Sequence, residues 1–461
     1  MAIISPFRAL RYDSTLVDPE KVVTQPYDKI TPAIQGRYYE ASPHNLVRII
    51  LGRPEPGDGD KENVYTRAAA SFSSWRQTGV LKRDPEPSIY AYEQRFAVPG
   101  DHSGTVLTRR GFVALLRLED YTSGIVHRHE QTLTKPKADR LNLLRATRAH
   151  FGQIFMLYEG DGQTLMDTGG EPTTEVRDEY GVGHRLWRVS EPETVRKVVE
   201  GMADRRLIIA DGHHRYETAL AYRNEQRQRS ALVGTTSTAV APSANPHEYV
   251  MATFVDMNAP GLAILPTHRV VHGLPAFETG DFVQRTRKNF MFQDVSILMP
   301  RVGGTGPHFD PEIARRLLTG EIESGVLTPE RMPSPGGVIM LAITPASTFL
   351  LYSKPGWADS VLSDVPPLQR QLDVVQLHKL LLESVLGMTE ADIREERHIS
   401  YYREASDAVE ALGRGANIAF LMNPVRMSQV RDIAFGGGVL PQKSTDFYPK
   451  LLSGLTIYAL D

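Results

Sequence analysis

The sequence has no cysteine among its 461 residues. Without thiol groups the chain can form no disulfide, no thiolate nucleophile, no iron–sulfur cluster and no cysteine-rich zinc site. This absence does not identify the cellular compartment by itself, because many proteins of every compartment lack cysteine.

Long apolar runs are also missing. The longest apolar stretches, such as Val338–Ile343, are far shorter than the ~20 residues that a helix needs to cross a bilayer. The first residues, from Met1 to Arg8, lack the basic segment and apolar core of a signal peptide. We therefore expect a soluble, cytoplasmic protein that has no membrane partner.

A strong net charge is the third absence. The chain has 52 basic and 55 acidic residues, which gives a formal net charge of −3. This balance provides no basic surface for nucleic acid, so we expect no nucleic-acid partner. Apolar residues make up 41% and charged residues 23% of the chain, as in ordinary globular proteins. Composition thus indicates an enzyme-sized α/β protein and nothing finer.

Helical and strand patterns alternate along most of the chain, and no internal repeat is visible. This alternation predicts an α/β fold class with a mixed sheet and some α+β elements. The glycine-rich run from Pro300 to Pro307 favours a flexible connection between domains. We therefore predict an α/β domain with an anion site over residues 1–300, and a second α/β domain or subdomain over residues 301–461.

The sharpest local signal is a strand that leads into a helix. Residues 206–210 form a short apolar run, and a helical pattern begins at His213. Asp211 is placed to cap that helix, and Gly212 lets a ligand approach the backbone. Free N–H groups and the positive end of the helix dipole make such a junction an anion site.

Polar side chains strengthen this interpretation. His213, His214 and Arg215 add donors at the same junction, and Arg215 suits a phosphate held by two hydrogen bonds. The alternative is a capped helix with exposed polar residues. Two adjacent histidines at a strand end favour a functional site, because such residues rarely help packing.

A second polar segment surrounds Glu130. On an extended segment His127 and His129 share one face and Glu130 points the other way, which argues against these three as a metal cluster. A loop would permit that cluster. Glu130 suits a general base if it lies partly buried near a substrate hydroxyl. The alternative is a solvated ion-pair network at a helix start that includes Lys137 and Arg140.

Two further clusters lie later in the chain. Thr267, His268 and Arg269 suit contacts with an oxyanion or a phosphate, although a structural histidine fits the pattern equally well. Three glycines precede Lys443, as in a phosphate-binding loop, but the G-x-x-x-x-G-K-S/T spacing is missing. Lys443 is therefore either an anion-binding residue or a surface lysine.

Taken together, these segments resemble one family. The resemblance rests on the segments 26–28, 129–147, 210–219, 265–269, 441–445 and 448–450. In this order, and nearly end to end, the chain is similar to the poorly characterised bacterial and archaeal DUF-1015 family. That resemblance implies no proven reaction.

The junction also has a local resemblance of its own. Residues Asp211 to Arg215 are similar to the signature of the ParB/sulfiredoxin superfamily, which includes free-serine kinases. In that superfamily the glycine, the helix N-terminus and the arginine hold nucleotide phosphates, which implies that Gly212, His213, His214 and Arg215 bind the nucleotide. Sulfiredoxin chemistry is excluded because it requires a cysteine. ParB-like DNA binding is disfavoured because no basic helix-turn-helix region is evident.

The resemblance and the residues together predict a nucleotide-dependent kinase that phosphorylates a small hydroxyl metabolite, with free L-serine as the leading candidate. The resemblance implies ATP or ADP and Mg²⁺, although no metal ligand can be assigned. We predict Glu130, Asp211 and His213 as catalytic residues. The residues predicted to contact the substrate are Lys137, Arg140, His268, Arg269 and Lys443.

Two other functions remain open at this level. One is a metal-dependent hydrolase that uses Zn²⁺ or Mn²⁺ and some of the histidines near Glu130 and Asp211. The other is a regulatory protein that binds a nucleotide without turnover. The sequence leaves the oligomeric state and the pathway undetermined.

Overall fold

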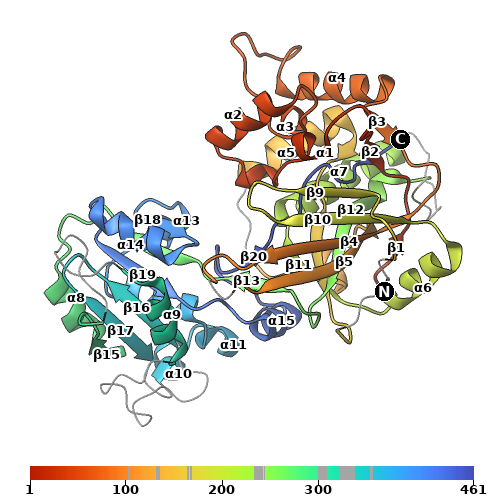
Figure 1. Cartoon of the computed structure of the whole chain (residues 1–461). Helices are drawn as coiled ribbons and strands as arrows, with labels where there is room; N and C mark the ends of the chain where they lie inside the picture. Colours follow the sequence, from red (N-terminus) through yellow and green to blue (C-terminus); the bar gives the residue numbers. More distant parts are fainter. Residues whose placement is uncertain are drawn as a thin grey trace.

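The computed structural model describes residues 1–101, 104–130, 135–162, 166, 169–232, 242, 244–298, 309–321, 338–353 and 357–461. The chain forms two lobes, each built around its own sheet (Figure 1). Both lobes combine strands with helices, and the larger sheet mixes parallel and antiparallel pairs. The predicted α/β fold class with a mixed sheet is confirmed.

The first lobe contains a nine-stranded sheet with the order β6-β11-β8-β12-β5-β4-β10-β9, and β1 pairs with β5. Its central strands β8 and β12 are buried along their whole length, because helices and loops cover both faces. The strands are β1 (Ile4–Ser5), β4 (Ile89–Ala97), β5 (Val106–Arg117), β6 (Val126–Arg128), β8 (Ile154–Tyr158), β9 (Thr174–Arg177), β10 (Gly183–Val189), β11 (Leu207–Asp211) and β12 (Tyr249–Asp256).

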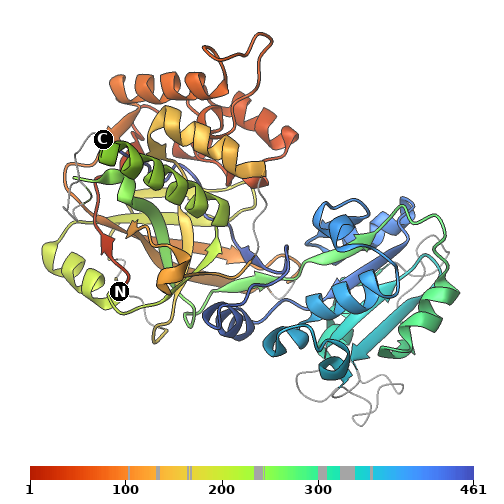
Figure 2. The same cartoon turned by 180° about the vertical axis from the view of Figure 1, so that it is seen from behind.

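Helices α7, α5 and α4 pack in successive layers on this sheet. Helix α7 contacts β8, β12 and α5, and α5 in turn contacts α4, so the helical layer extends outward from the sheet (Figures 1 and 2). The helices of the first lobe are α1 (Pro19–Val22), α2 (Pro32–Ala41), α3 (Val47–Ile50), α4 (Val64–Gln77), α5 (Lys135–Thr147), α6 (Pro192–Met202) and α7 (His213–Leu232). The described part of the chain has no helix long and apolar enough to span a membrane.

The second lobe contains an antiparallel sheet with the order β15-β17-β16-β19-β14-β18. Helices α9 and α14 cover one face, and the π-helix Leu377–Glu383 and α8 bury apolar side chains in a separate cluster. The strands are β14 (His268–Val271), β15 (Phe290–Asp294), β16 (Ile339–Ile343), β17 (Thr348–Ser353), β18 (Ile399–Tyr402) and β19 (Ile418–Met422). The helices are α8 (Thr279–Thr286), α9 (Pro311–Thr319), α10 (Trp357–Val361), α11 (Pro367–Arg370), α12 (Asp373–Gln376), α13 (Glu390–Arg394), α14 (Ala405–Gly413) and α15 (Met427–Phe435).

The last residues of the chain return from the second lobe to the first. We call residues 439–461 the return segment. In it, β20 (Asp446–Tyr448) pairs with β13 (Ala263–Leu265), and β21 (Tyr458–Ala459) pairs with β7 (Ala149–His150). The division predicted after residue 300 falls outside the described residues. Along the chain, β12 is the last strand of the first sheet and β14 is the first strand of the second sheet. The return segment contributes to the first lobe.

A buried arginine attaches the return segment to the first sheet. Arg109 of β5 is 1% exposed, and its guanidinium donates to the carbonyl oxygens of Tyr448 at 3.0 Å and Pro449 at 2.5 Å. The same group donates to Oε1 of Gln94 and lies 4.7 Å from the ring centre of Phe155. Buried carbonyl oxygens need donors, so this one side chain fixes the backbone just before Lys450.

The variant Arg109→Met is expected to lower the free energy of unfolding by about 3 kcal/mol, because it leaves several buried acceptors without donors. Urea unfolding followed by circular dichroism measures this loss. Arg110→Met is the matched control, since Arg110 is half exposed and forms one ion pair with Glu93. It is expected to cost less than about 1 kcal/mol. Equal losses in the two variants would contradict the anchoring role of Arg109.

Candidate active site

The predicted strand and helix around Asp211 are confirmed. Strand β11 is buried from Leu207 to Ala210 and ends at Asp211, and α7 begins at His213. Gly212 links the two elements with a φ of +93°, a conformation that favours glycine. A Cβ atom on Gly212 would also lie 3.1 Å from Nε of Arg215. The junction therefore needs glycine for its backbone and for the close approach of the arginine.

Asp211 is surrounded by cations. Arg215 donates to Oδ2 of Asp211 at 2.7 Å and to the carbonyl oxygen of Gln153 at 2.5 Å. Nζ of Lys450 lies 3.7 Å from Oδ1 of Asp211. Burial raises the pKa of Asp211, but Lys450, Arg215 and Lys29 outweigh burial and hold the pKa below its usual value. Asp211 is therefore an ionised anchor for cations and a weak base.

The pKa of Glu130 is shifted in the opposite direction. It forms an isolated β-bridge with Leu440 of the return segment, and its Oε1 accepts a hydrogen bond from the backbone N–H of Lys443. Burial raises the pKa of Glu130 to about 7, although the Lys443 N–H and the charge of Lys450 oppose this shift. A carboxyl group with a pKa near 7 can accept a proton at neutral pH and release it again.

Two histidine rings lie against each other next to these carboxylates. The centres of the His129 and His213 rings are 4.9 Å apart. Nδ1 of His129 lies 2.6 Å from the carbonyl oxygen of Ile209, so it carries the proton, and Nε2 accepts from the Thr445 hydroxyl at 2.7 Å. Burial lowers the pKa of both histidines, that of His129 to about 4. Both rings are thus neutral near pH 7.

His213 has an unused ring nitrogen. Its Nε2 is buried and has no hydrogen-bond partner among the described residues. A buried polar atom without a partner costs free energy that a ligand atom would recover. His214, the next residue of α7, accepts a hydrogen bond from Thr218 through its carbonyl oxygen.

Sequence reasoning did not assign a role to Lys450, which completes this cluster. Its side chain is 10% exposed, and Nζ lies 3.1 Å from Oδ1 of Asp446 as well as near Asp211. Burial lowers its pKa, but Asp211 and Asp446 outweigh burial and raise the pKa overall. Asp446 also pairs with Arg403, at 2.7 Å. The only sequence signal was the position of Lys450 in the block 448–450, which carries the family resemblance.

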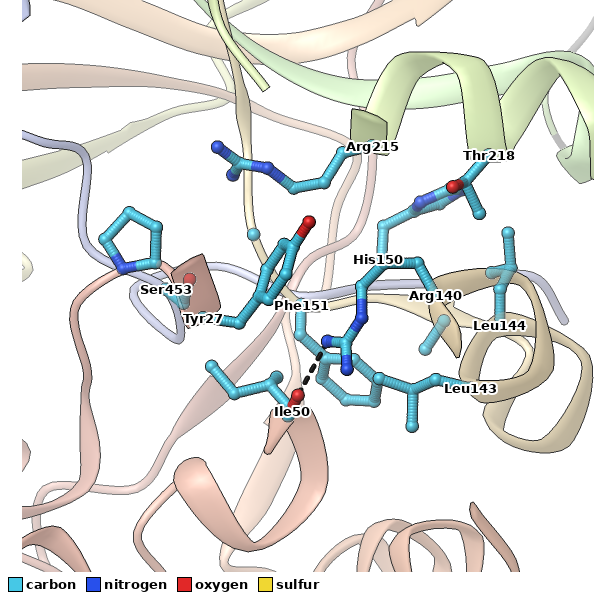
Figure 3. A pocket seen from close by; sticks show the side chains of 13 residues that line it. Tyr27, Ile50, Arg140, Leu143, Leu144, His150, Phe151, Arg215, Thr218 and Ser453 are labelled. Carbon is cyan, nitrogen blue, oxygen red and sulfur yellow. Dashed lines mark hydrogen bonds between the residues drawn. The ribbon is translucent and has the colours of Figure 1, made fainter. Parts of the chain in front are cut away.

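A pocket opens beside Arg215. It holds about 570 Å³ of empty space, part of it open to solvent. In Figure 3 the hydroxyl of Tyr27 points toward Arg215, and Arg140 lies beside the Tyr27 ring. Arg140 donates to the carbonyl oxygen of Ile50 at 2.6 Å. The pocket thus combines two guanidinium groups and a phenol with an apolar floor that includes Phe151.

The other residues predicted to contact substrate lie in different places. Lys137 belongs to α5, but its side chain lies outside the described part of the structure. His268 and Arg269 are buried in β14 of the second lobe. Nδ1 of His268 accepts from the N–H of Met422 at 3.2 Å, and Arg269 donates to the carbonyl oxygen of Lys443 at 2.9 Å. Arg269 therefore contacts the backbone of Lys443, whose N–H binds Glu130, and its charge also interacts with Glu130.

A metal centre of the zinc type, held by three or more protein side chains, finds little support in this arrangement. Across the described ranges, no three histidine, aspartate or glutamate side chains are grouped so that they could hold a metal ion. The ring nitrogens of His127 lie 3.1 Å from the carbonyl oxygen of Ala434 and 3.0 Å from that of Gly124. Those contacts, and the buried contacts of His129, occupy the nitrogens that a zinc ion would need.

Comparisons with solved structures give low similarity. A mutant free serine kinase in complex with ADP is 12% identical, with 70% of this chain and 84% of that chain covered and a TM-score of 0.32. A conserved hypothetical protein from Pyrococcus furiosus is 13% identical, with 71% and 89% covered and a TM-score of 0.31. SbnI with a C-terminal truncation, from Staphylococcus aureus, is 9% identical, with 74% and 85% covered and a TM-score of 0.32.

No curated protein matches the chain in sequence. A family model described as "Protein of unknown function (DUF1015)" matches residues 4–375, which is most of the chain. The chain therefore belongs to the DUF1015 family.

Proposed function

We propose that this protein is a kinase that transfers a phosphoryl group from ATP or ADP to a hydroxyl group of a small metabolite, with free L-serine as the leading acceptor. The observation that carries the proposal is that two neighbouring carboxyl groups have pKa values shifted in opposite directions. The pKa of Glu130 is raised to about 7, whereas cations hold the pKa of Asp211 below its usual value. Two carboxyl groups with pKa values shifted in opposite directions are typical of acid–base sites.

The N-terminus of α7 supports a phosphate-binding role. This helix has 20 residues, and its first N–H groups have no partner within the helix, so they are available to an anion. Arg215 lies one turn into the helix, with a guanidinium group suited to phosphate oxygens. The unpartnered Nε2 of His213 supplies a further donor at the same end, because a neutral ring can carry its proton there.

Glu130 is the proposed base. In the transfer, the acceptor hydroxyl oxygen forms a bond to the terminal phosphorus, and the bond from that phosphorus to the nucleotide oxygen breaks. The hydroxyl proton moves to Glu130. Lys450 lies near enough to lower the pKa of both Glu130 and Asp211, so its charge also reaches phosphate oxygens held at the junction. Phosphoryl transfer depends mainly on such positioning and charge stabilisation.

The pocket beside Arg215 supports the proposed acceptor class. Arg140 and the hydroxyl of Tyr27 are suited to a carboxylate, and the pocket floor is apolar. A small amino acid with a hydroxyl group, such as L-serine, would place its carboxylate there and leave its hydroxyl free. Under the same proposal Lys137, His268, Arg269 and Lys443 contribute to substrate binding, Arg269 through its hydrogen bond to the carbonyl oxygen of Lys443.

A charged carboxylate at the junction also fits Mg²⁺. Such ions usually reach an enzyme with the nucleotide phosphates and take only one or two protein carboxylates. Asp211 is the proposed ligand, because its lowered pKa keeps the carboxylate charged. When bound, Mg²⁺ would offset negative charge on the phosphate oxygens.

The first test detects product by mass spectrometry. Wild-type protein with Mg²⁺, ATP or ADP, and a pool of amino acids and hydroxy compounds is expected to add one phosphoryl group to serine. Arg215→Ala is expected to lose about 100-fold or more of this activity, because it removes a donor to phosphate. Arg145→Ala is the matched control, since that arginine also pairs with a carboxylate but is half exposed on α5.

If the test detects a phosphorylated compound other than serine, the kinase mechanism stands and that compound takes the place of serine as the acceptor. Nucleotide binding without any product would favour a regulatory protein, and absence of both product and nucleotide binding would refute the kinase proposal.

The second test concerns the base. Glu130→Gln is expected to bind nucleotide with wild-type affinity in calorimetry but to lose about 100-fold or more in turnover, because the amide cannot accept the proton. Glu175→Gln is the control, because Glu175 lies in β9 at the opposite edge of the same sheet. Wild-type turnover in Glu130→Gln would make Glu130 a structural residue.

The raised pKa of Glu130 also predicts how stability depends on pH. Between its ordinary value of 4.5 and about 7, folded Glu130 holds a proton that the unfolded chain has released. The free energy of unfolding therefore falls as pH rises through this range, by up to about 3 kcal/mol. Urea unfolding at pH 5 and pH 8 is expected to show this fall in wild-type protein and a smaller one in Glu130→Gln. Parallel losses in both proteins would mean that the pKa of Glu130 is not raised.

A further inference from the structure

A second pocket lies in the second lobe, between its helical elements and the start of the return segment. It contains about 1300 Å³ of empty space, part of it open to solvent. Its walls come from α11, the π-helix, α13 and residues 439–442 (Figure 1 labels α11 and α13). We propose that this pocket binds a free α-amino acid, at a site separate from the junction at Asp211. The proposal does not depend on the proposed kinase activity.

A buried histidine points to a ligand in this pocket. His378 lies in the π-helix, is 8% exposed and lines the pocket. Its Nε2 is buried and has no hydrogen-bond partner among the described residues. Burial lowers the pKa of His378 to about 3, and the nearby charges of Arg269 and Lys379 act in the same direction. The ring is therefore neutral and offers one nitrogen to a polar ligand atom.

The charged side chains of the pocket are of both signs. Arg394 is exposed at the pocket and forms a long ion pair with Glu395, at 3.9 Å. Asp364 and Glu390 also line the pocket, and neither forms an ion pair within the described ranges. Lys379 and Glu383 neutralise each other at 3.0 Å. Carboxylates thus outnumber cations here, which disfavours a nucleotide or another polyanion.

This arrangement fits a zwitterion. A carboxylate is suited to Arg394, and an ammonium group is suited to Glu390 or Asp364. The inner wall is apolar and includes Val375, Ile393 and Leu440, so it can receive a side chain. His378 Nε2 would then meet a polar atom of the ligand. An ammonium and a carboxylate group on one small molecule, together with a side chain, describe an α-amino acid.

The pocket also contacts the residues that hold Glu130. Leu440 lines the pocket and forms the β-bridge with Glu130. Three residues further along the chain, just beyond the pocket wall, Lys443 donates its N–H to Glu130 and its carbonyl oxygen accepts from Arg269. A ligand against Leu440 would therefore lie next to the backbone that positions Glu130. A ligand that moved Leu440 would therefore also move Glu130 of the first lobe.

The test is calorimetric titration of the full-length protein with each of the 20 standard amino acids. At least one is expected to bind, and both His378→Phe and Arg394→Ala are expected to weaken that binding at least about tenfold, since each removes a polar contact. Arg394 is exposed, so its variant should fold even if His378→Phe does not. Arg397→Ala is the matched control, because Arg397 pairs with Asp392 and Glu395 outside the pocket wall.

Further variants separate this site from the first lobe. Glu130→Gln and Arg215→Ala are expected to keep the binding, since both residues lie outside the pocket. The proposal is overturned if no amino acid binds, or if Arg394→Ala binds as wild type does. It is equally overturned if Arg215→Ala abolishes the binding while Arg394→Ala leaves it intact, because the amino acid would then occupy the pocket beside Arg215. None of these outcomes depends on kinase activity, so the two proposals can fail independently.

Discussion

The burial of Lys450 is the constraint on which the arrangement of the site depends. A lysine whose side chain is only 10% exposed needs carboxylate partners, because an unpaired charge inside a protein is strongly unfavourable. Asp211 and Asp446 are those partners, and they lie more than 230 residues apart in sequence. The cluster can form only after the chain has completed the second lobe and returned to the first sheet.

The return segment is held by side chains of both lobes. Arg109 holds the backbone of the return segment against β5, and Arg269 of the second lobe holds the carbonyl oxygen of Lys443. Lys443, the residue that Arg269 holds, also donates its backbone N–H to Glu130. The environment of Glu130 is therefore built by residues from both lobes. A change in the second lobe that moves Lys443 would change the proton affinity of Glu130.

The two carboxyl groups of the junction acquire different properties from the same fold. Asp211 ends a strand and lies among Arg215, Lys450 and Lys29, so its charged form is favoured. Glu130 is desolvated by the return segment and has fewer compensating partners, so its neutral form is favoured. Such a division allows one carboxylate to hold cations while the other exchanges a proton at neutral pH. It is a property of the surroundings and not of the residue types.

Local sequence determined the parts of the site that depend on neighbouring residues. The apolar run before Asp211, the glycine after it and the helical pattern from His213 predicted the strand, the turn and the helix, because short-range periodicity and backbone preferences decide these elements. The sequence also singled out Glu130 and Arg215 as candidates, but it could assign neither a pKa nor a partner to them.

Only the tertiary structure brought Lys450 to Asp211 and Leu440 to Glu130, and placed Arg269 behind Lys443 instead of at the junction. Burial and long-range pairing decide these contacts, and neither is encoded in the local pattern of residues.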